Sequence, residues 1–340
     1  MAVARIAAIA LACAASAPAV AAAQPARTLD VATLAPERSA WLNILEEAAA
    51  ELRRATAGRV AVKLYPGGAR GSEREMVREL RRGRLDGAVL TSVGLSLIYP
   101  GIRVLELPFL FESTAEVDYV RAQMWPQFQA AFAQRGFVLA AYGDLGWTYL
   151  YSNRPVRARE DLNRIKAWAW QDDPIVRALY RRIGLNGVPL GVPDVAAALA
   201  SGRIDAVYGP PLAIVAMQWH TGVRYASSMP VAYSMGAVVL RADALAGLSA
   251  ADRAAFDAFA RRLSRELVAR VRRDNRRALR AMVAGGLQIV DTPPALAAWF
   301  AAQARAVWTD LRGALYSAEE LDRAVALRDE LRARKNARRP

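Results

Sequence analysis

The sequence predicts an α/β fold of two similar lobes, with a ligand cleft between the lobes and one long helix spanning both. Two distant stretches read almost alike, LRRGRLDGAV at 80–89 and LASGRIDAV at 199–207. In each, an apolar-periodic helix stops at a glycine and leads into a short apolar run, the helix-to-strand unit of an α/β sheet. Residues 249–284 contain neither Pro nor Gly. With 340 residues, 54% of them apolar, the chain is long enough for about two domains.

The repeat also predicts where a ligand binds. Gly83 and Gly202 allow the positive φ of a helix C-terminal turn, and a short strand follows each of them. Thr91–Ser92 comes directly after the first strand, and Tyr208–Gly209 ends the second. Open α/β sheets bind ligands at the carboxyl ends of their strands, so these residues are expected to face each other across a cleft. The alternative is that helix, glycine and strand recur by chance.

Periodicity and capping residues predict the elements of the first lobe. Ser39 begins a helix of 3.6-residue period that ends near Gly58. Ser72, with Glu75 three residues later, forms a capping-box signature. The expected elements are a strand at 29–34, a helix at 39–58, a strand at 60–65, a helix at 72–82, an apolar segment at 105–111 beneath the cleft, a helix ending near 135 and a strand at 137–142.

The second lobe is expected to begin near Trp147. Asp173 followed by Pro174 predicts the start of a helix, and Gly184 its end. The expected elements are a strand at 149–152, a short helix around 161, a strand at 166–170, a helix at 173–184 and the repeat strand at 206–208. The helix at 249–284, capped by Ser249, would be about 50 Å long. Its apolar positions keep no strict heptad, which favours packing within the monomer over a coiled-coil dimer.

The N-terminus has the pattern of a cleaved secretory signal. One early cation, Arg5, precedes an apolar run and the small residues Ala21 to Ala23, after which Gln24 begins the mature chain. A short anchor and a lipoprotein cut before Cys13 are the alternatives. Because Cys13 is the only cysteine, a chain cut after Ala23 has no disulfide, no thiolate nucleophile and no cysteine metal ligand. No later segment is long and uncharged enough to span a membrane.

Charge and residue types argue against a nucleic-acid-binding protein and against an enzyme. The net charge is +14, but the arginines fall on polar faces of helices, as in Arg261–Arg262, Arg272–Arg273 and Arg276–Arg277, which predicts solvated faces. The chain has one histidine and lacks a Gly-x-Ser-x-Gly elbow, a His-rich metal motif and a phosphate-binding Gly loop. Asp86 and Asp205 recur at the same turn of the repeat and are expected to be structural.

The order and spacing of five blocks resemble the periplasmic solute-binding proteins of tripartite ATP-independent periplasmic (TRAP) transporters, the DctP-like family. The blocks are LDVATLAPERSAW, LYPGGARGSEREMVRELRRGRLDGAV, LELPFLFES, SNRPVRAREDLNRIK and residues 184–210. The resemblance implies a two-lobed periplasmic-binding-protein fold that closes on a small organic solute. It also implies delivery of that solute to a sodium-driven pair of small and large membrane subunits, with no cofactor.

One departure from the family pattern concerns the ligand. The family strand usually reads Lys-x-Arg, and its arginine clamps the ligand carboxylate with two charge-assisted hydrogen bonds. This chain reads Lys166-Ala167-Trp168 instead, which is similar to a subgroup with a Trp-x-Trp strand. Contacts that some members make with a cation, an Asn and an acid fall at Thr148, Gly209 and Thr91. The usual carboxylate anchor is therefore missing.

Aromatic side chains are expected to surround the cleft instead. They are Trp147, Trp168, Trp170 and Tyr208. An indole offers a flat apolar face and one N–H donor, so we predict a ligand that is aromatic, apolar or weakly anionic. Alternatively, Lys166 or Arg70 meets a ligand carboxylate. For Trp168, the alternative is that it points into the core while Trp170 faces the cleft.

Two further features are interpreted with their alternatives. Gln171 and Asp172 could supply oxygen ligands to a cation bound with the solute, whereas Asp173 is expected to cap the following helix. His220, the only histidine, is equally consistent with a ligand contact and with a packed surface residue. The complete set of candidate ligand-binding residues is Trp168, Trp170, Trp147, Thr148, Thr91, Ser92, Tyr208, Gly209, Leu34, Ser39, Gln171 and His220.

Each lobe is expected to consist of two separate segments of the chain. Residues 1–23 form the signal, 24–145 with about 235–270 form lobe I, and 146–234 with about 271–340 form lobe II. The sequence thus predicts a monomeric periplasmic receptor that is not an enzyme, does not span a membrane and binds no nucleic acid. A receptor that presents its ligand to a sensor protein is the alternative function.

Overall fold

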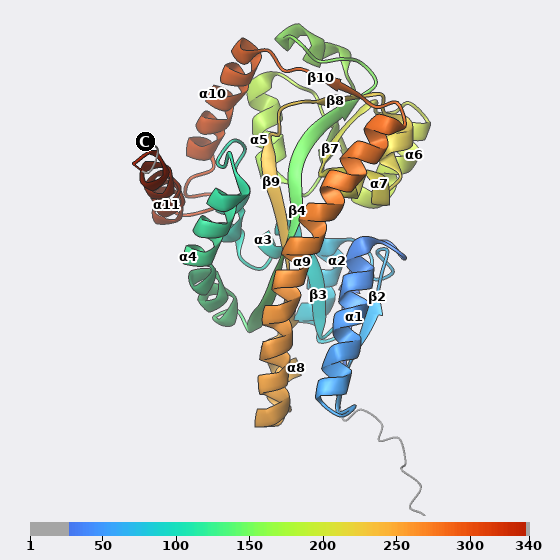
Figure 1. Cartoon of the computed structure of the whole chain (residues 1–340), viewed down its shortest axis with the longest axis vertical. Coiled ribbons are helices and arrows are strands. Elements are labelled where there is room, and N and C mark those ends of the chain that lie inside the picture. The colour runs from blue at the N-terminus through green and yellow to red at the C-terminus, as the bar shows by residue number, and fades with distance from the viewer. Residues whose placement is uncertain (1–26, 338–340) are drawn as a thin grey trace, which may run out of the picture.

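The computed structural model describes residues 27–337 (Figure 1). The predicted signal peptide, Cys13 and the last residues of the basic tail lie outside this range. Within it, no helix is both long and apolar enough to cross a membrane.

The strands and helices alternate, as an α/β fold requires. The strands are β1 Arg27–Thr33, β2 Val60–Tyr65, β3 Gly87–Thr91, β4 Phe137–Ser152, β5 Trp168–Trp170, β6 Val188–Leu190, β7 Ala206–Gly209, β8 Tyr225–Ser227, β9 Ala232–Arg241 and β10 Gln288–Val290. The α-helices are α1 Ala40–Ala55, α2 Glu73–Arg81, α3 Ser92–Ser96, α4 Thr114–Ala133, α5 Pro174–Ile183, α6 Val195–Ala200, α7 Pro211–Ala216, α8 Ala242–Ala246, α9 Ala250–Ala284, α10 Pro294–Asp310 and α11 Ala318–Asn336. The 3₁₀ helices are η1 Pro100–Glu106, η2 Arg159–Arg164, η3 Val192–Asp194 and η4 Trp219–Gly222.

Capping residues begin and end the helices where the sequence predicts. The Ser39 hydroxyl accepts from the Leu42 N–H at the start of α1, and Ser72 and Glu75 form the predicted capping box of α2. Gly184 ends α5 in the left-handed conformation, with φ of 71°. These local predictions are confirmed because each depends on residues within one helical turn.

The two copies of the repeat have the same local structure. Gly83 and Gly202 have φ of 71° and 68°. In the first copy, Asp86 Oδ2 accepts from the Asp30 N–H at 3.0 Å. In the second, Asp205 Oδ1 accepts from the Lys166 N–H at 2.6 Å. Each aspartate side chain therefore links its turn by a hydrogen bond to the backbone of a neighbouring segment, which confirms the structural role predicted for both.

One long strand, β4, belongs to both halves of the molecule. The sheet order is β10-β8-β4-β9-β3-β1-β2, with β7 also paired to β4 and with β5 and β6 forming a separate pair. Residues 137–148 of β4 run antiparallel to β9, whereas 149–152 pair with β7. In Figure 1, β4 runs through the middle of the fold beside α9. The prediction of separate strands at 137–142 and 149–152 is therefore wrong.

Two glycines explain why one strand looks like two. Gly143 and Gly146 interrupt the apolar alternation of β4, and the register shifts between Asp144 and Gly146. A Cβ at Gly143 would lie 2.9 Å from Leu267 Cδ1, and one at Gly146 would lie 2.7 Å from Asn275 Nδ2. Gly146 also has φ of +119°. Both glycines let α9 approach β4 closely, so they mark a packing contact and a bulge instead of a strand end.

The long helix α9 packs on the chain itself, as predicted. Ser249 caps it by accepting from the Asp252 N–H at 3.1 Å. Its apolar face is buried against the sheet and α1 through Phe256, Leu263 and Leu267. The C-terminal helices extend this arrangement, since α10 packs against α5, and α11 packs against α4 and η1. The division of these segments between two lobes stays a prediction.

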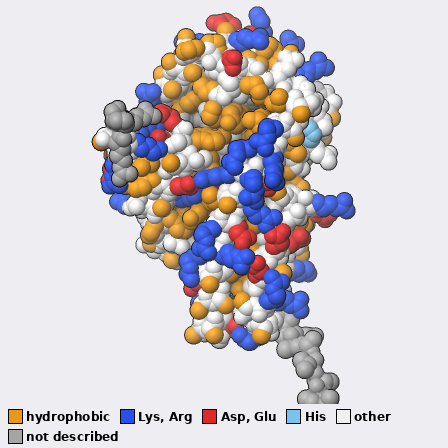
Figure 2. Space-filling model, in the orientation of Figure 1, with side chains coloured by type: hydrophobic (Ala, Val, Ile, Leu, Met, Phe, Trp, Pro, Cys, Tyr) orange, Lys and Arg blue, Asp and Glu red, His pale blue; other side chains and the backbone are white. Residues whose placement is uncertain are grey.

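The arginines follow the predicted solvated pattern only in part. Arg261, Arg273, Arg276 and Arg277 are exposed on α9, where Figure 2 shows a basic stripe on the front face. Arg272 contradicts the prediction, because its side chain is 19% exposed and donates to Asp144 Oδ2 at 2.6 Å. Helical periodicity predicts which residues share a face of the helix. Whether a given arginine forms an ion pair depends on the acidic residues of the strand that packs beside the helix.

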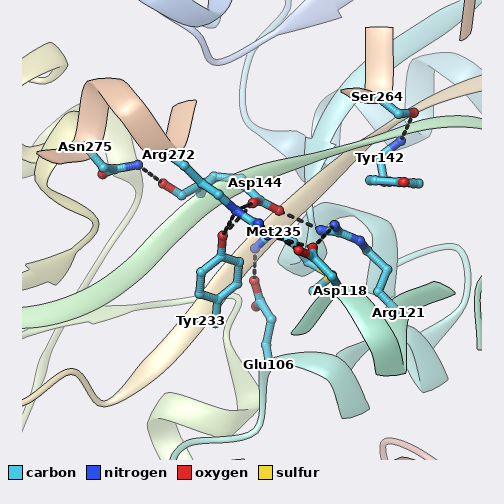
Figure 3. A network of polar contacts seen from close by, with 11 residues as sticks. Glu106, Asp118, Arg121, Tyr142, Asp144, Tyr233, Met235, Ser264, Arg272 and Asn275 are labelled. Carbon is cyan, nitrogen blue, oxygen red and sulfur yellow. Dashed lines mark hydrogen bonds and ion pairs between the residues drawn. The ribbon is translucent and has the colours of Figure 1, made fainter. Parts of the chain in front are cut away.

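Asp144 is the centre of a buried polar network that joins four elements (Figure 3). This β4 carboxylate is 1% exposed and accepts from Arg121 of α4 at 2.6 Å and from Arg272 of α9. The Tyr233 hydroxyl of β9 also donates to it, and burial raises the pKa of Tyr233. Asp118 of α4 completes the network by accepting from both arginines. The network thus holds β4, β9, α4 and α9 together.

We expect Asp144→Asn to lower the free energy of unfolding by about 3–5 kcal/mol, because two largely buried arginines lose a shared carboxylate. Urea denaturation of the mature protein measures this difference. The matched control is Asp243→Asn, which removes the 73% exposed partner of Arg241 and is expected to change stability by about 1 kcal/mol or less. Equal effects of the two substitutions would contradict the central role of Asp144.

Candidate functional site

A cavity of about 180 Å³ lies where the two copies of the repeat meet. Thr91 and Ser92, which follow β3, and Tyr208 and Gly209, which end β7, all line it. The carboxyl-end residues of both repeat strands therefore share one cavity, as the sequence predicts. A cavity of about 150 Å³ holds a benzene molecule, so this one has room for a small organic solute.

Eight of the predicted ligand-binding residues lie in the cavity wall. They are Leu34, Thr91, Ser92, Thr148, Trp168, Trp170, Tyr208 and Gly209. Alternation along β4 explains why Thr148 belongs to this group while its neighbour Trp147 does not.

The other four predicted residues lie outside the wall. Trp147 packs edge to face on Tyr233, with ring centroids 4.9 Å apart. Ser39 caps α1, and Gln171 lines a smaller neighbouring pocket. His220 is half-buried and follows Trp219, whose side chain is the one that reaches the cavity. Each of these four residues lies within two positions of a residue that does line the cavity. The sequence therefore predicts the segment correctly, and the tertiary packing decides which of its side chains faces the cavity.

Trp168 and Trp170 line the cavity together. They are two residues apart on β5, so they share a face of the strand, and their rings stack with centroids 6.0 Å apart. Trp168 also stacks on Tyr208 at 4.7 Å. Trp168 is nevertheless 2% exposed and belongs to a buried core cluster as well, so its contact with a ligand stays a prediction. The indole N–H of Trp168 is not available to a ligand, however, because it donates to the Leu190 carbonyl at 3.1 Å.

Many wall residues are absent from the predicted set. Six of these are aromatic or acidic: Trp41, Trp219, Glu73, Glu106, Asp144 and Asp173. Glu106 could have been predicted from the sequence, because it is the single charged residue of the apolar segment 105–111, which is buried in the structure. Trp41 gave no such signal, since it reads as an ordinary apolar position of α1.

Glu73 and Glu106 are carboxylates buried in the wall, at 4% and 9% exposure. Glu73 accepts from the Thr91 N–H at 2.5 Å and from the Thr91 hydroxyl at 2.8 Å. Burial nevertheless raises the pKa of Glu73 to about 7, and the neighbouring charge of Glu106 adds to this rise. Glu106 Oε1 accepts from the Met235 N–H at 2.7 Å, and burial raises the pKa of Glu106 as well.

A buried ion pair lies next to the wall. Arg103 of η1, 2% exposed, donates through Nη2 to both oxygens of Asp173, at 2.9 and 3.0 Å. Its Nε and Nη1 atoms have no hydrogen-bond partner among the described residues. Asp173 also accepts from the Ile175 N–H, which confirms its predicted role as the cap of α5.

The remaining cations and the candidate metal ligand are engaged elsewhere. Lys166 Nζ donates to the Gly202 carbonyl, and the Arg70 guanidinium stacks 4.1 Å from the Tyr65 ring centroid. Neither lines the cavity, and contact of either one with a ligand carboxylate stays a prediction. Asp172 pairs with Arg74 at 2.6 Å, and the described residues contain no group of three or more His, Cys, Asp or Glu side chains that could hold a metal ion.

Solved structures share the whole fold at low sequence identity. The sugar-acid-binding protein DctPAm of Advenella mimigardefordensis, in complex with galactonate, superposes with a TM-score of 0.84 at 16% identity, covering 90% of this chain and 99% of that one. DctP7 of Bordetella pertussis, an extracytoplasmic solute receptor binding pyroglutamic acid, gives a TM-score of 0.82 at 19% identity, covering 89% and 99%. These similarities show the two-lobed periplasmic-binding-protein fold.

Sequence relatives are similar over much of the chain. A solute-binding protein of Verminephrobacter eiseniae is 25% identical over 245 residues, 72% of this chain and 73% of the relative. YiaO of Escherichia coli, a 2,3-diketo-L-gulonate-binding periplasmic protein, is 26% identical over 200 residues, 58% of this chain and 61% of the relative.

The model of one protein family matches residues 31–312, which include both copies of the repeat and the entire cavity wall. Its description is bacterial extracellular solute-binding protein, family 7, the DctP family. The match covers more than four-fifths of the sequence and identifies a binding protein, not an enzyme. The chain belongs to this family of bacterial extracellular solute-binding proteins.

Proposed function

We propose that the protein is the extracytoplasmic receptor of a TRAP-type transporter. It captures a small organic solute in the cavity between β3 and β7 and delivers it to small and large membrane subunits. The observation that carries this proposal is that the carboxyl ends of both repeat strands, distant in sequence, line one cavity of about 180 Å³.

The ligands of related proteins support a small solute. The similar structures hold compounds such as pyroglutamic acid, D-glucuronate and L-galactonate. All are compact organic acids of a size suited to a cavity of this order. Nothing among the relatives favours the alternative of a receptor for a sensor protein.

Two ion pairs support capture by closure. Arg103 of η1 pairs with Asp173, and Arg74 of α2 pairs with Asp172. Both pairs join the first half of the chain to the turn that follows β5. They fit the predicted closure of lobe I, residues 24–145 with about 235–270, on lobe II, residues 146–234 with about 271–340. The packing of α11 on α4 adds a further connection between these two sets of residues.

The place of action follows from the family and the leader sequence. We propose that the chain is exported to the periplasm, cleaved after Ala23 and active there as a monomer. Docking of the loaded receptor on the membrane subunits then passes on the solute.

We expect Trp168→Ala to weaken solute binding by about tenfold or more, because the stacked aromatic wall loses its central ring. Thermal stabilisation by a panel of carboxylates, neutral analogues and aromatic compounds first identifies a ligand, and a fluorescence titration then gives the affinities. Trp168→Phe keeps a ring and tests whether a loss comes from misfolding. Trp299→Ala, on α10 and outside the cavity, is the control. Unchanged affinity in Trp168→Ala would contradict this assignment.

Export is tested separately. Full-length protein expressed in a Gram-negative host is expected in the osmotic-shock fluid, with a mass that corresponds to a chain beginning at Gln24. Substituting Ala21 and Ala23 by Glu is expected to block processing, because the cleavage site needs small residues. Recovery of the uncleaved chain from the cytoplasm would contradict the proposed location.

A further inference from the structure

The cavity wall contains no cation. Among the residues of 27–337 that line it, none is Lys, Arg or His. The Arg103 guanidinium pairs with Asp173, and its Nη2 lies 3.6 Å from Glu106 Oε2. A ligand carboxylate in this cavity would lose its water of hydration and gain no positive partner from the wall.

The wall carries negative charge instead. Glu73, Glu106, Asp144 and Asp173 all line the cavity. Arg121 and Arg272 pair with Asp144, and Arg103 pairs with Asp173 and lies 3.6 Å from Glu106. Burial is the main cause of the raised pKa of Glu73, and the charge of Glu106 adds to it. A further carboxylate, from the ligand, would meet like charges in a poorly solvated space.

Polar atoms at the wall suit a ligand that both donates and accepts hydrogen bonds. Glu106 Oε1 accepts from the Met235 N–H (Figure 3), and Oε2 is 3.6 Å from Arg103 Nη2, longer than a hydrogen bond. The Ser92 hydroxyl, 1% exposed, also lies beside the Glu106 carboxylate and can donate to it. A carboxylate has about four lone-pair sites, so Glu106 keeps acceptor capacity for a ligand beyond these contacts. The Trp41 indole N–H has no hydrogen-bond partner among the described residues, and it can donate to a ligand carbonyl.

The rest of the wall suits an apolar body. Its aromatic members are Trp41, Trp168, Trp170, Tyr208 and Trp219. Such rings bury apolar surface, and their faces also attract a cation.

We propose that the solute is a small apolar or aromatic molecule with an amide or amine end, and that Glu106 accepts a hydrogen bond from that end. This inference rests on the proposed function, because it names the class of solute that the receptor captures. It separates this chain from the organic-acid receptors that share its fold.

The test compares matched compounds that differ only in their polar end. The probes are phenylacetamide, phenethylamine and phenylacetate, and the corresponding butyramide, butylamine and butyrate, each added to the mature protein at pH 8. We expect the amide or the amine to raise the melting temperature and the carboxylate of the same set to leave it unchanged. Stabilisation chiefly by the carboxylates would overturn this inference and leave the receptor function standing. No stabilisation by any member would count against both.

Substitutions test whether Glu106 contacts the solute. We expect Glu106→Gln to weaken amide or amine binding about tenfold or more, because its amide keeps one acceptor for Met235 but loses the second. Ser92→Ala is a second variant that leaves Arg103 and its partners intact, and it is expected to weaken binding in the same direction. The control is Glu46→Gln, an exposed position of α1 with the same change of charge. Affinities equal to wild type in both cavity variants would refute the assignment.

Discussion

The architecture depends on β4 and on the carboxylate at its centre. One strand pairs with β9 along most of its length and with β7 and β8 at its end, so both halves of the molecule are built on the same backbone. Asp144 lies at the bulge within the part of β4 that pairs with β9, and its charge is neutralised by arginines of α4 and α9. A buried charge with fewer partners would be costly, so the packing of these elements depends on the complete network. The cavity borders this junction, and Asp144 itself lines it.

The chemistry of the site follows from what surrounds it. Trp168 lines the cavity, and its ring stacks on Trp170 and Tyr208. Arg103 brings a guanidinium close to the same cavity, but Asp173 holds it beside the wall. A cation is thus present in the neighbourhood but not among the residues of 27–337 that line the cavity. The same fold can therefore serve different ligands when a few wall residues change.

Much of the local structure could be predicted because its causes are local. Ser39, Ser72 and Ser249 cap helices through hydrogen bonds to residues three positions ahead. The repeat also predicted that Thr91 and Tyr208 share a site, since strand ends of an α/β sheet gather ligands. The continuity of β4 was missed because the glycines that allow α9 to pack closely against it also resemble the end of a strand in the sequence. Trp41 and Trp219 were missed because an aromatic residue of a helix or turn reads the same in a core and in a cavity.

The sequence by itself determined the fold class, the helix ends, the family and the strand ends that line the cavity. These depend on patterns within a few residues and on the order of motifs along the chain. Only the tertiary structure decided which charges are buried together and which polar atoms stay free. Arg272 meets Asp144 across 128 residues, and Glu106 meets Met235 across 129. Such pairs form where separate elements pack, and no local pattern records which side chain of each element turns inward.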